Sequence, residues 1–415
     1  MRVLHLSTTD IRGGAARGAY WLHQSLRDAG VESTMLVGRK YSDDSDVMAP
    51  EGLVSRLGGR LRAELDCLPL RFYRKTDESF WTVGWIRNRI EREVRRLEPD
   101  IVHLHWTGGG YLPIQELRQL NYPLVWTLRD MWAFTGGCHY SAGCERYEVG
   151  CGQCPQLRSH GDGDLSRRMW RRRADEWRDV DLWLVPISRW LAECVRRSPL
   201  FRHAPIEVIP NGLDTHYFHP TEQQEAREIW RLKPDQRYIL YGALGATRDP
   251  RKGFGHLAQA LRRLAKDGWG DRAEVVVFGD IEPSEAPDLG LTAHYVGEVS
   301  DDRRLAALYA SADVMVVPSL QEAFGKTLIE GMACGTPIVA FNHGGPADIV
   351  SHRRTGYLAK PFCPHDLAAG IAWCLSDRKL TQELGRHAHL RANDKYRIEV
   401  VAAQYRALYQ RILGR

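Results

Sequence analysis

The chain has 415 residues, too many for one ordinary hydrophobic core. At about 150 residues per domain it should contain two or three domains, and we expect two. Its formal net charge of +5 permits an anionic substrate or surface but is far from that of a dedicated nucleic-acid-binding protein. No apolar run reaches about 18 residues, which argues against a transmembrane helix.

Two further features concern the cellular compartment. The N-terminal stretch MRVLHLSTTD becomes polar after six positions, too soon for the apolar core of a signal peptide. The nine cysteines are an odd number in a large chain. Both features favour a reducing cytoplasm.

Short apolar strands alternate with amphipathic helices along the chain, which is typical of parallel α/β sheets. In the first half, the pattern predicts a helix over 15–30 and strands at 2–7, 32–38, 100–106 and 123–130. In the second half, it predicts helices over 254–268 and 302–312 and strands at 237–243, 273–280, 294–299, 314–319 and 337–342. A strand, a helix and a Pro-Asn-Gly turn lie between the halves, and we place the domain boundary near residue 205.

A pair of glutamates, Glu322 and Glu330, brackets a predicted helix start in the second half. The stretch QEAFGKTLIEGMACGTP follows a buried strand, and its helix should begin near Gly325 and stop at Gly335. Open α/β sheets bind ligands at such a carboxyl edge, and the unpaired N–H groups of a helix start attract a diphosphate. Lys326 adds a full positive charge there.

The positions of the two carboxylates suggest different roles. Glu330 lies about 7 Å into the helix at ~1.5 Å per residue, a distance that suits hydrogen bonds to the vicinal hydroxyls of a nucleotide ribose. Glu322 precedes the helix and would face the group attached beyond the phosphates. The alternative is that both are helix-cap and surface charges, which stabilise a helix start without any ligand.

With these residues in place, the sequence resembles a known family. EAFGKTLIE, followed by GMACGTPIVAFNHGGPADIV, looks like the E-x7-E signature of retaining GT-B glycosyltransferases of the large family-four group, which use nucleotide-sugar donors. The resemblance extends over nearly the whole chain, through GGAARGA, VHLHW, TLRDMW, IPNGLDTHYF, DPRKGF and KYRIEVVAAQYRALYQRIL. The stretch TGGCHYSAGCERYEVGCGQCPQL is similar to a bacterial exopolysaccharide or cell-envelope subgroup.

The resemblance implies the GT-B fold, an α/β architecture of two Rossmann-like, doubly wound domains that face an interdomain cleft. The acceptor domain would comprise residues 1–205, with a cysteine-rich insertion at about 136–156. A C-terminal helix at 396–415 would cross back and complete it. Residues 206–395 would form the nucleotide-sugar donor domain.

The resemblance also implies roles for single residues. Glu330 would hold the donor ribose, and Glu322 would contact the transferred sugar as a catalytic residue. Further residues would bind the sugar and the diphosphate: Phe324, Gly325, Lys326, Thr327, Lys252, and Arg251 or Arg248. Which arginine contacts the diphosphate stays open, and a solvated charge pair in a turn is the alternative for Arg251 and Lys252. No metal cofactor would be required, because these cations can stabilise the departing diphosphate.

In the acceptor half, TLRD replaces the more common TLHD, so Arg129 occupies the usual histidine position beside Asp130. An arginine is always charged and cannot act as a general base, so proton handling would move to Asp130, His105 or the departing phosphate. His103 and His105 alternate along one strand, so only one should face the cleft, and a satisfied core histidine is the alternative for either.

Gly13 and Gly14 follow the first strand in the stretch DIRGGAARG. They would let the backbone approach a donor or acceptor in the cleft. The stretch lacks the full G-x-G-x-x-G pattern, and the alternative is a tight turn without a ligand.

Four cysteines, Cys138, Cys144, Cys151 and Cys154, fall within 17 positions and end in a C-x-x-C pair. This composition is typical of a tetrahedral structural zinc site, although the first spacing is looser than in a standard knuckle. The alternatives are unligated thiols, a disulfide-capable pair and an iron–sulfur cluster.

Two basic stretches, 56–75 and 165–178, combine arginines with Leu, Trp and Phe. They could settle peripherally on an anionic membrane surface that carries a lipid-linked acceptor. Ordinary solvated helix faces are the alternative.

We therefore expect a retaining, metal-independent transferase that moves a hexose-type sugar from a nucleotide-diphosphate sugar. The acceptor would be a glycan, a lipid-linked or a small molecule in polysaccharide or cell-envelope biosynthesis, and no nucleic-acid partner is expected. The alternatives on the same fold are a nucleotide-sugar epimerase or hydrolase, and a non-catalytic protein that binds sugar nucleotides.

Overall fold

The computed structural model describes residues 1–50, 53–74, 76, 80–243, 245–281 and 287–414. The chain divides into two compact units, Met1–Gly212 with Val401–Arg415, and Leu213–Val400. The first unit thus ends slightly beyond the expected boundary near residue 205, and it includes the end of the chain. Within the described ranges, no helix is both long and apolar enough to cross a membrane.

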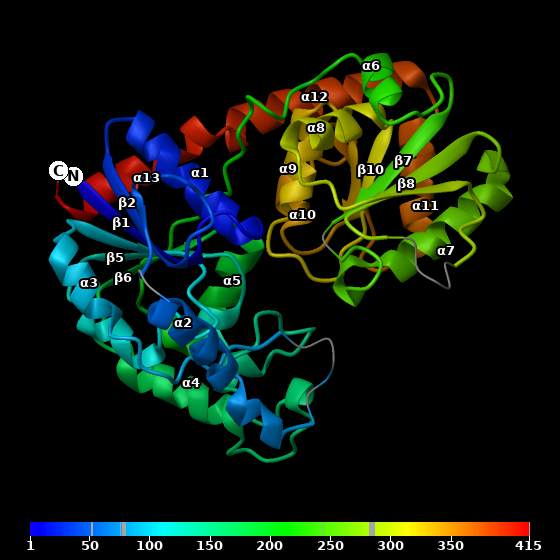
Figure 1. Ribbon diagram of the computed structural model, residues 1–415. Coiled ribbons are helices and arrows are strands. Elements are labelled where there is room, and N and C mark those ends of the chain that lie inside the picture. The colour runs from blue at the N-terminus through cyan, green and yellow to red at the C-terminus, as the bar shows by residue number, and fades with distance from the viewer. Residues whose placement is uncertain (51–52, 75, 77–79, 244, 282–286, 415) are drawn as a thin grey trace. The chain divides into compact units, whose positions relative to one another are not determined.

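The first unit is built on a six-stranded parallel sheet with the strand order β3-β2-β1-β4-β5-β6 (Figure 1). Its strands are β1 (Arg2–Thr9), β2 (Glu32–Arg39), β3 (Val47–Met48), β4 (Ile101–Leu104), β5 (Leu124–Leu128) and β6 (Leu182–Pro186). Its helices are α1 (Gly14–Asp28), α2 (Leu53–Asp66), α3 (Ile90–Leu97), α4 (Leu165–Glu176), α5 (Arg189–Arg197) and most of α13 (Ile398–Ile412). Short 3₁₀ turns connect them at η1 (Leu68–Phe72), η2 (Ile114–Gln119), η3 (Trp132–Phe134), η4 (Arg146–Val149), η5 (Pro155–Leu157) and η6 (Pro199–Phe201).

The second unit contains another six-stranded parallel sheet, with the order β12-β11-β10-β7-β8-β9. Its strands are β7 (Arg237–Gly242), β8 (Ala273–Phe278), β9 (Ala293–Gly297), β10 (Val314–Val317), β11 (Ile338–Phe341) and β12 (Gly356–Ala359). Its helices are α6 (Gln223–Ile229), α7 (Phe254–Leu264), α8 (Asp302–Ser311), α9 (Lys326–Ala333), α10 (Pro346–Ile349), α11 (Pro364–Leu375) and α12 (Arg378–Tyr396). A 3₁₀ turn, η7 (Pro250–Lys252), precedes α7, and a π-helical turn, η8 (Ala265–Trp269), follows it.

Both sheets have the same topology when each unit is counted from its own first strand. β1 lies beside β4 in one unit and β7 lies beside β10 in the other, and from these pairs the strand order runs outward in opposite directions. This is the doubly wound arrangement, in which ligands bind outside the carboxyl ends of the strands where the order reverses. The expected fold class, two Rossmann-like α/β domains, is confirmed.

The central strands are largely apolar and buried because helices cover both faces of the sheet. In β10 and β8 every residue is buried, including the consecutive valines of each strand. Such continuous apolar runs are characteristic of parallel strands that are buried on both faces, whereas a strand with one solvated face alternates polar and apolar residues. This burial fixes the sheet, and it leaves the loops at the strand ends free to carry polar groups.

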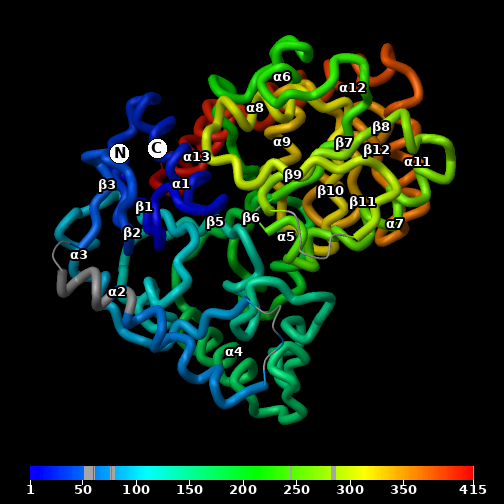
Figure 2. Tube along the Cα trace, turned by 45° about the vertical axis from the view of Figure 1, so that its right-hand side comes forward, coloured from blue at the N-terminus to red at the C-terminus, as the bar shows by residue number. Residues whose placement is uncertain are grey.

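The last helix, α13, packs onto the sheet of the first unit, and both Figure 1 and Figure 2 show it beside α1. The Tyr405 hydroxyl is hydrogen-bonded to Thr127 Oγ1 at 2.7 Å, and the Tyr409 hydroxyl to His103 Nδ1 at 2.6 Å. The helix begins at Ile398, later than the expected residue 396, because Arg397 has a non-helical backbone (ψ 134°) that ends α12.

Buried histidines cluster around this contact in the core of the first unit. His5 Nδ1 and His105 Nε2 are hydrogen-bonded at 2.8 Å, and both imidazoles are fully buried together with His103. Burial lowers the pKa of all three side chains well below the ordinary value of about 6.5, and the nearby Arg129 guanidinium lowers it further. Their ligand nitrogens lie within 4.8 Å of one another, but the positive charge of Arg129 makes the group a poor cation site.

The histidine cluster predicts a pH dependence of stability. The folded state keeps these imidazoles neutral, whereas the unfolded chain protonates them below about pH 6.5, so the free energy of unfolding should fall as the pH falls from 7 towards 5. Each histidine contributes a slope of up to about 1.4 kcal/mol per pH unit. Urea unfolding at several pH values, followed by tryptophan fluorescence, measures this slope.

A matched pair of variants separates the cluster from other titrating groups. His5→Asn should reduce the slope, because Asn can replace one hydrogen bond but does not titrate. His216→Gln should leave it unchanged, since His216 is exposed in the other unit. A stability that is flat between pH 7 and 5 would contradict the assignment of neutral buried imidazoles.

Candidate functional site

Three loops meet at the carboxyl edge of the second sheet, around the point where the strand order reverses between β7 and β10. The loop after β7 contains the turn η7, which Gly253 follows directly. A side chain at Gly253 would overlap the carbonyl oxygen of Pro318, the residue after β10. The Leu320 N–H donates to the Arg251 carbonyl at 2.7 Å. Only a glycine, with its positive φ of 76°, allows this close backbone contact.

The loop after β11 packs against the same segment from its other side. The Gly345 N–H donates to the Glu322 carbonyl at 2.8 Å, and a side chain at Gly345 would overlap the carbonyl of Ala323. A side chain at Gly344 would also press on the Glu322 carbonyl. The segment from Pro318 to Ala323, which includes Glu322, is therefore held by backbone contacts from both neighbouring loops.

These loops bring Glu322 and Lys252 together across 70 positions of sequence. Lys252 Nζ donates to Glu322 Oε2 at 2.7 Å, and the two side chains remain 23% and 14% exposed. The pair is therefore neither a surface ion pair nor a sealed one. A ligand that approaches this edge meets a lysine and a carboxylate that can each exchange its partner.

Glu330 lies on α9, which begins at Lys326 after the left-handed residue Gly325 (φ 93°), as the sequence predicted. Glu330 Oε2 accepts a hydrogen bond from the Tyr309 hydroxyl at 2.8 Å, and Glu330 Oε1 lies 3.6 Å from Lys326 Nζ. The carboxylate is 6% exposed, which makes a plain surface charge an inadequate description. Tyr309, on α8, is a partner that the sequence pattern did not indicate.

The neighbours of Gly325 differ in their surroundings. Phe324 is buried and packs edge-on against the Tyr396 ring, with 5.8 Å between the centroids, so it supports the loop from inside. Thr327 is half-buried in the first turn of α9. Of these two donor-binding candidates, Thr327 has the more accessible side chain.

Both candidate arginines are held by carboxylates. Arg248 Nε donates to Asp280 Oδ2 at 3.0 Å while its side chain stays 79% exposed. Arg251 Nε donates to Asp249 Oδ1 at 3.1 Å. Asp280 follows β8, a position that sequence reasoning did not single out, and either arginine would have to loosen this contact to reach a phosphate.

In the first unit, a second polar group surrounds Asp130, which follows β5. Asp130 Oδ2 is hydrogen-bonded to His139 Nδ1 at 2.7 Å and accepts the Trp106 indole N–H at 3.0 Å. Its other oxygen accepts the Trp132 backbone N–H at 2.9 Å. His139 Nε2 is hydrogen-bonded to Thr82 Oγ1 at 2.8 Å, so both ring nitrogens are engaged.

The imidazole that hydrogen-bonds Asp130 is therefore that of His139, a residue that the sequence analysis did not select. The candidate His105 has its ring in the buried histidine cluster, where it contacts His5. Arg129 is also turned inward: it hydrogen-bonds Asn211 Oδ1 and occupies the space left by Gly18, while burial lowers its pKa to about 10. The position of His139, beside Cys138 in GGCHY after a predicted strand, was the available signal.

The glycine loop at the end of β1 has a structural reason for its first glycine. Gly13 has φ 91° and caps α1, which starts at Gly14, and nothing lies within 4 Å of a side chain built at Gly13. Upstream, Asp10 accepts the backbone N–H groups of Ile11, Tyr41 and Ser42 at 2.8–3.0 Å. The loop is thus pinned by Asp10 and leaves the space beside Gly13 open.

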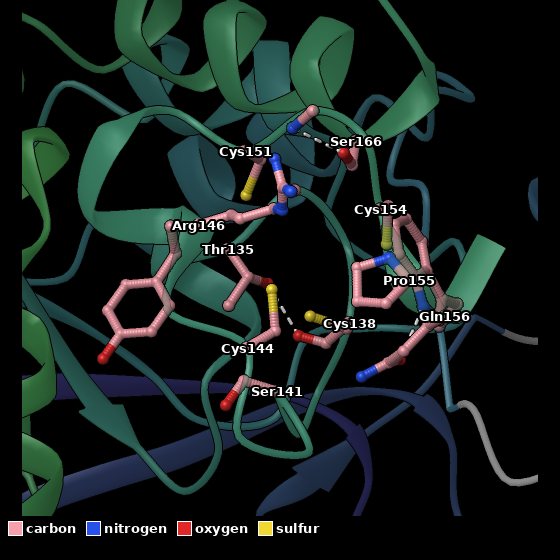
Figure 3. Close-up of a pocket in the computed structure, with 14 residues that line it drawn as sticks. Thr135, Cys138, Ser141, Cys144, Arg146, Cys151, Cys154, Pro155, Gln156 and Ser166 are labelled. Atoms are coloured by element: carbon pink, nitrogen blue, oxygen red, sulfur yellow. Dashed lines mark hydrogen bonds between the residues drawn. The ribbon is translucent and has the colours of Figure 1, made fainter. Parts of the chain in front are cut away.

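The four clustered cysteines line a single pocket, and Figure 3 shows their sulfur atoms facing it. None of the four belongs to a disulfide. Burial raises the pKa of the Cys151 thiol to about 12 and that of Cys154 to about 11, and it raises the pKa of Cys138 as well. The expected metal residues are therefore brought together, whereas Cys67, Cys194, Cys334, Cys363 and Cys374 do not line this pocket.

Comparison with known proteins gives matches over both units. Residues 12–217 match the family described as "Glycosyltransferase Family 4", and residues 222–391 match "Glycosyl transferases group 1". The chain is 31% identical to the MMP alpha-(1->4)-mannosyltransferase of Mycolicibacterium hassiacum, over 100% of this chain and 99% of that one. It is 28% identical to a D-inositol 3-phosphate glycosyltransferase of Paenarthrobacter aurescens, over 70% of this chain and 67% of the relative.

Solved structures show the same fold. Sucrose-phosphate synthase of Thermosynechococcus elongatus superimposes with a TM-score of 0.71 at 21% identity and covers 100% of this chain and 99% of its own. Anabaena HepE in complex with UDP and glucose gives a TM-score of 0.65 at 16% identity, with 98% and 99% covered. With the family matches over both units and the full-length relative, the chain belongs to the group 1, family-four glycosyltransferases and has their GT-B fold.

Proposed function

We propose that this glycosyltransferase takes a hexose-type sugar from a nucleotide-diphosphate sugar and transfers it with retention of the anomeric configuration. The observation that carries the proposal is the gathering of two carboxylate–lysine pairs, Lys252–Glu322 and Lys326–Glu330, around the start of α9. Two cations and a helix start can hold a diphosphate, and two carboxylates remain for hydroxyl groups on either side of it.

The diphosphate would lie at the N-terminus of α9 beside Gly325. Lys252 and Lys326 would turn from their carboxylates to the phosphate oxygens, because a phosphate offers more charge than a carboxylate. Glu322, released from Lys252, would then face the sugar. When the donor binds, Arg248 or Arg251 would contact its diphosphate, and the Thr327 hydroxyl would donate a further hydrogen bond to it.

Glu330 would bind the ribose. A carboxylate has about four lone-pair sites, and Tyr309 and Lys326 each contact one of the two Glu330 oxygens. When Lys326 turns to the phosphate, the Tyr309 hydroxyl would still fix the carboxylate, so the ribose hydroxyls would meet an oriented acceptor. HepE, which shares the fold, has been solved with UDP and with UDP-glucose, which supports the choice of a nucleotide sugar as the donor class.

The chemical step follows from the charges available. Departure of the diphosphate leaves an oxocarbenium-like sugar, and the lysines and helix start stabilise the leaving group without a required metal ion. The acceptor hydroxyl attacks from the leaving-group face while a phosphate oxygen accepts its proton. Glu322 orients the sugar and stabilises its developing positive charge.

The acceptor would be held by the first unit, near Asp130 and the open side of Gly13 and Gly14. The imidazole of His139 orients the Asp130 carboxylate, which can then accept a hydrogen bond from an acceptor hydroxyl. Among the relatives, one acts by its name on an inositol phosphate and another is a mannosyltransferase. We therefore keep a small molecule, a glycan and a lipid-linked sugar as the acceptor classes.

We further propose that the first unit contacts an anionic membrane surface from the cytoplasmic side. Phe72 is 87% exposed and Leu61 is 56% exposed, with arginines close to both in the sequence. Tyr73 joins the two basic stretches: its hydroxyl accepts the Leu165 N–H and the Arg168 guanidinium, each at 3.0 Å. Lys75 and the side chains of residues 56–58 and 60 lie outside the described part of the chain.

The donor site generates the first functional prediction. UDP-, GDP- and dTDP-sugars should be screened by thermal stabilisation, since a ligand at 100 times its Kd adds about 2.7 kcal/mol. For the donor so found, Glu330→Gln should weaken binding by about 1.5 to 3 kcal/mol, the usual range for a hydrogen bond to a charged group. Isothermal calorimetry with the free nucleotide diphosphate measures it.

Two further variants make this experiment specific. Glu322→Gln should lower kcat more than donor affinity, because its carboxylate acts on the sugar in the transition state. Glu383→Gln changes an exposed glutamate of the same unit and should alter neither quantity. Unchanged nucleotide affinity in folded Glu330→Gln would remove the ribose assignment.

The proposed mechanism predicts a retained anomeric configuration and activity without divalent metal. NMR of the anomeric proton of the product gives the configuration, and parallel assays with and without EDTA give the metal requirement. An inverted product would overturn same-face attack. Activity that EDTA abolishes and only Mg²⁺ or Mn²⁺ restores would show that the lysines are insufficient. Release of free sugar with no acceptor product would indicate a hydrolase.

The exposed apolar residues predict binding to anionic vesicles. The protein should float with phosphatidylglycerol-containing vesicles and not with pure phosphatidylcholine vesicles. Phe72→Ser should weaken this binding by about tenfold to a hundredfold, because a buried Phe side chain contributes about 1.5 to 3 kcal/mol. Ile281→Ser is the matched control, since Ile281 is 75% exposed in the second unit. Equal vesicle binding by the two variants would contradict the proposed membrane-binding surface.

A further inference from the structure

The sugar transfer proposed above uses no side chain of the cysteine-lined pocket in the first unit, yet four thiols line this pocket. Its lining contains no carboxylate and no imidazole, so Cys138, Cys144, Cys151 and Cys154 are the soft donors that it offers. Arg146 adds a positive charge at its wall. Neutral thiols gain nothing from such a grouping, whereas thiolates that share a cation do.

The backbone around the C-x-x-C pair takes an unusual path to point these thiols inward. Cys151 and Gln153 have positive φ values of 58° and 45°, between and beside the glycines Gly150 and Gly152 at 92° and 98°. Non-glycine residues in this region carry strain and persist only where the surroundings impose it. The Cys154 N–H is also fixed, since it donates to Asp164 Oδ2 at 2.8 Å.

We propose that Cys138, Cys144, Cys151 and Cys154 bind one Zn²⁺ as a tetrahedral thiolate site. Zn–S bonds of about 2.3 Å would place the sulfurs about 3.8 Å apart. No three of these sulfurs, all in the described part of the chain, lie within 4.8 Å of one another, so the four are more widely spaced than in a zinc-bound site. Zinc binding would therefore require the four side chains, which line one pocket, to move closer together.

The site has a consequence for the proposed function, on which this step rests. Cys138 directly precedes His139, the partner of Asp130. The same segment pairs with the chain at Trp81 and Thr82: the Thr82 N–H donates to the Gly137 carbonyl at 3.0 Å, and Trp81 forms an isolated bridge with Cys138. Zinc on Cys138 thus holds His139 against Asp130 and makes His139 a positioning residue for the acceptor side.

Metal content tests the site directly. The full-length protein, purified from zinc-supplemented cells, should contain about one zinc per chain by mass spectrometry of the metal. Cys151→Ser and Cys154→Ser should lose it, and Cys67→Ser, an exposed cysteine outside the pocket, should keep it. Replacement by Co²⁺ should give the charge-transfer and visible bands of tetrahedral cobalt thiolate.

Chelation of the wild-type protein keeps the test valid even if the serine variants fold poorly. Removing zinc should lower the melting temperature, and adding zinc back should restore it, because metal binding is coupled to local folding. Wild-type protein without metal that melts unchanged in chelator would overturn the proposal. So would a disulfide in this cluster under reducing purification, the visible absorbance of an iron–sulfur cluster, or zinc retained by both serine variants.

The link to His139 is tested separately from the transferase proposal. In the zinc-free protein, acceptor KM or kcat should change while donor affinity by calorimetry stays the same, since the donor residues belong to the other unit. His139→Gln should reproduce this kinetic change and still bind zinc. If the wild-type protein binds zinc but shows no transfer, the proposed function fails and the zinc site stands. Unchanged acceptor kinetics without zinc would overturn the positioning role.

Discussion

The constraint on which the molecule depends is that every strand pair in its two sheets is parallel. All carboxyl ends of a sheet then lie on one edge, and the loops that leave them must share that space. In the second unit the loops after β7, β10 and β11 pack backbone to backbone, which the glycines at 253, 344 and 345 permit. Glu322 and Lys252 are 70 positions apart in the sequence, and they meet because the loops that carry them are packed together at this edge of the sheet.

The two carboxylate–lysine ion pairs are neither fully exposed to solvent nor completely buried. A pair in full solvent contributes little, and a sealed pair would be costly to separate. With side chains 14% and 23% exposed, Glu322 and Lys252 are desolvated enough to be ordered and open enough to accept a ligand. Glu330 is more enclosed, at 6% exposed, and its carboxylate accepts the Tyr309 hydroxyl.

In the first unit, the polar side chains near Asp130 differ from those that the sequence suggested. Arg129 and His105 are taken into the core, where Gly18 and His5 provide their surroundings, and Asp130 receives the imidazole of His139 instead. The proposed zinc site would stabilise the contact between His139 and Asp130, because His139 directly follows Cys138, the first cysteine of the cluster. Such a site requires a reducing compartment, because thiols must stay reduced to bind metal.

The sequence by itself determined the fold class, the strands and helices at the centre of each unit, and the helix start at Gly325 with its two flanking glutamates. Apolar runs, glycine positions and helix signals are local, so the sequence carries them completely. It could not determine that His139 reaches Asp130, that Tyr309 holds Glu330 or that Asp249 and Asp280 occupy the arginines. Those contacts join separate elements, and only the packing of loops at a shared sheet edge decided which side chains meet.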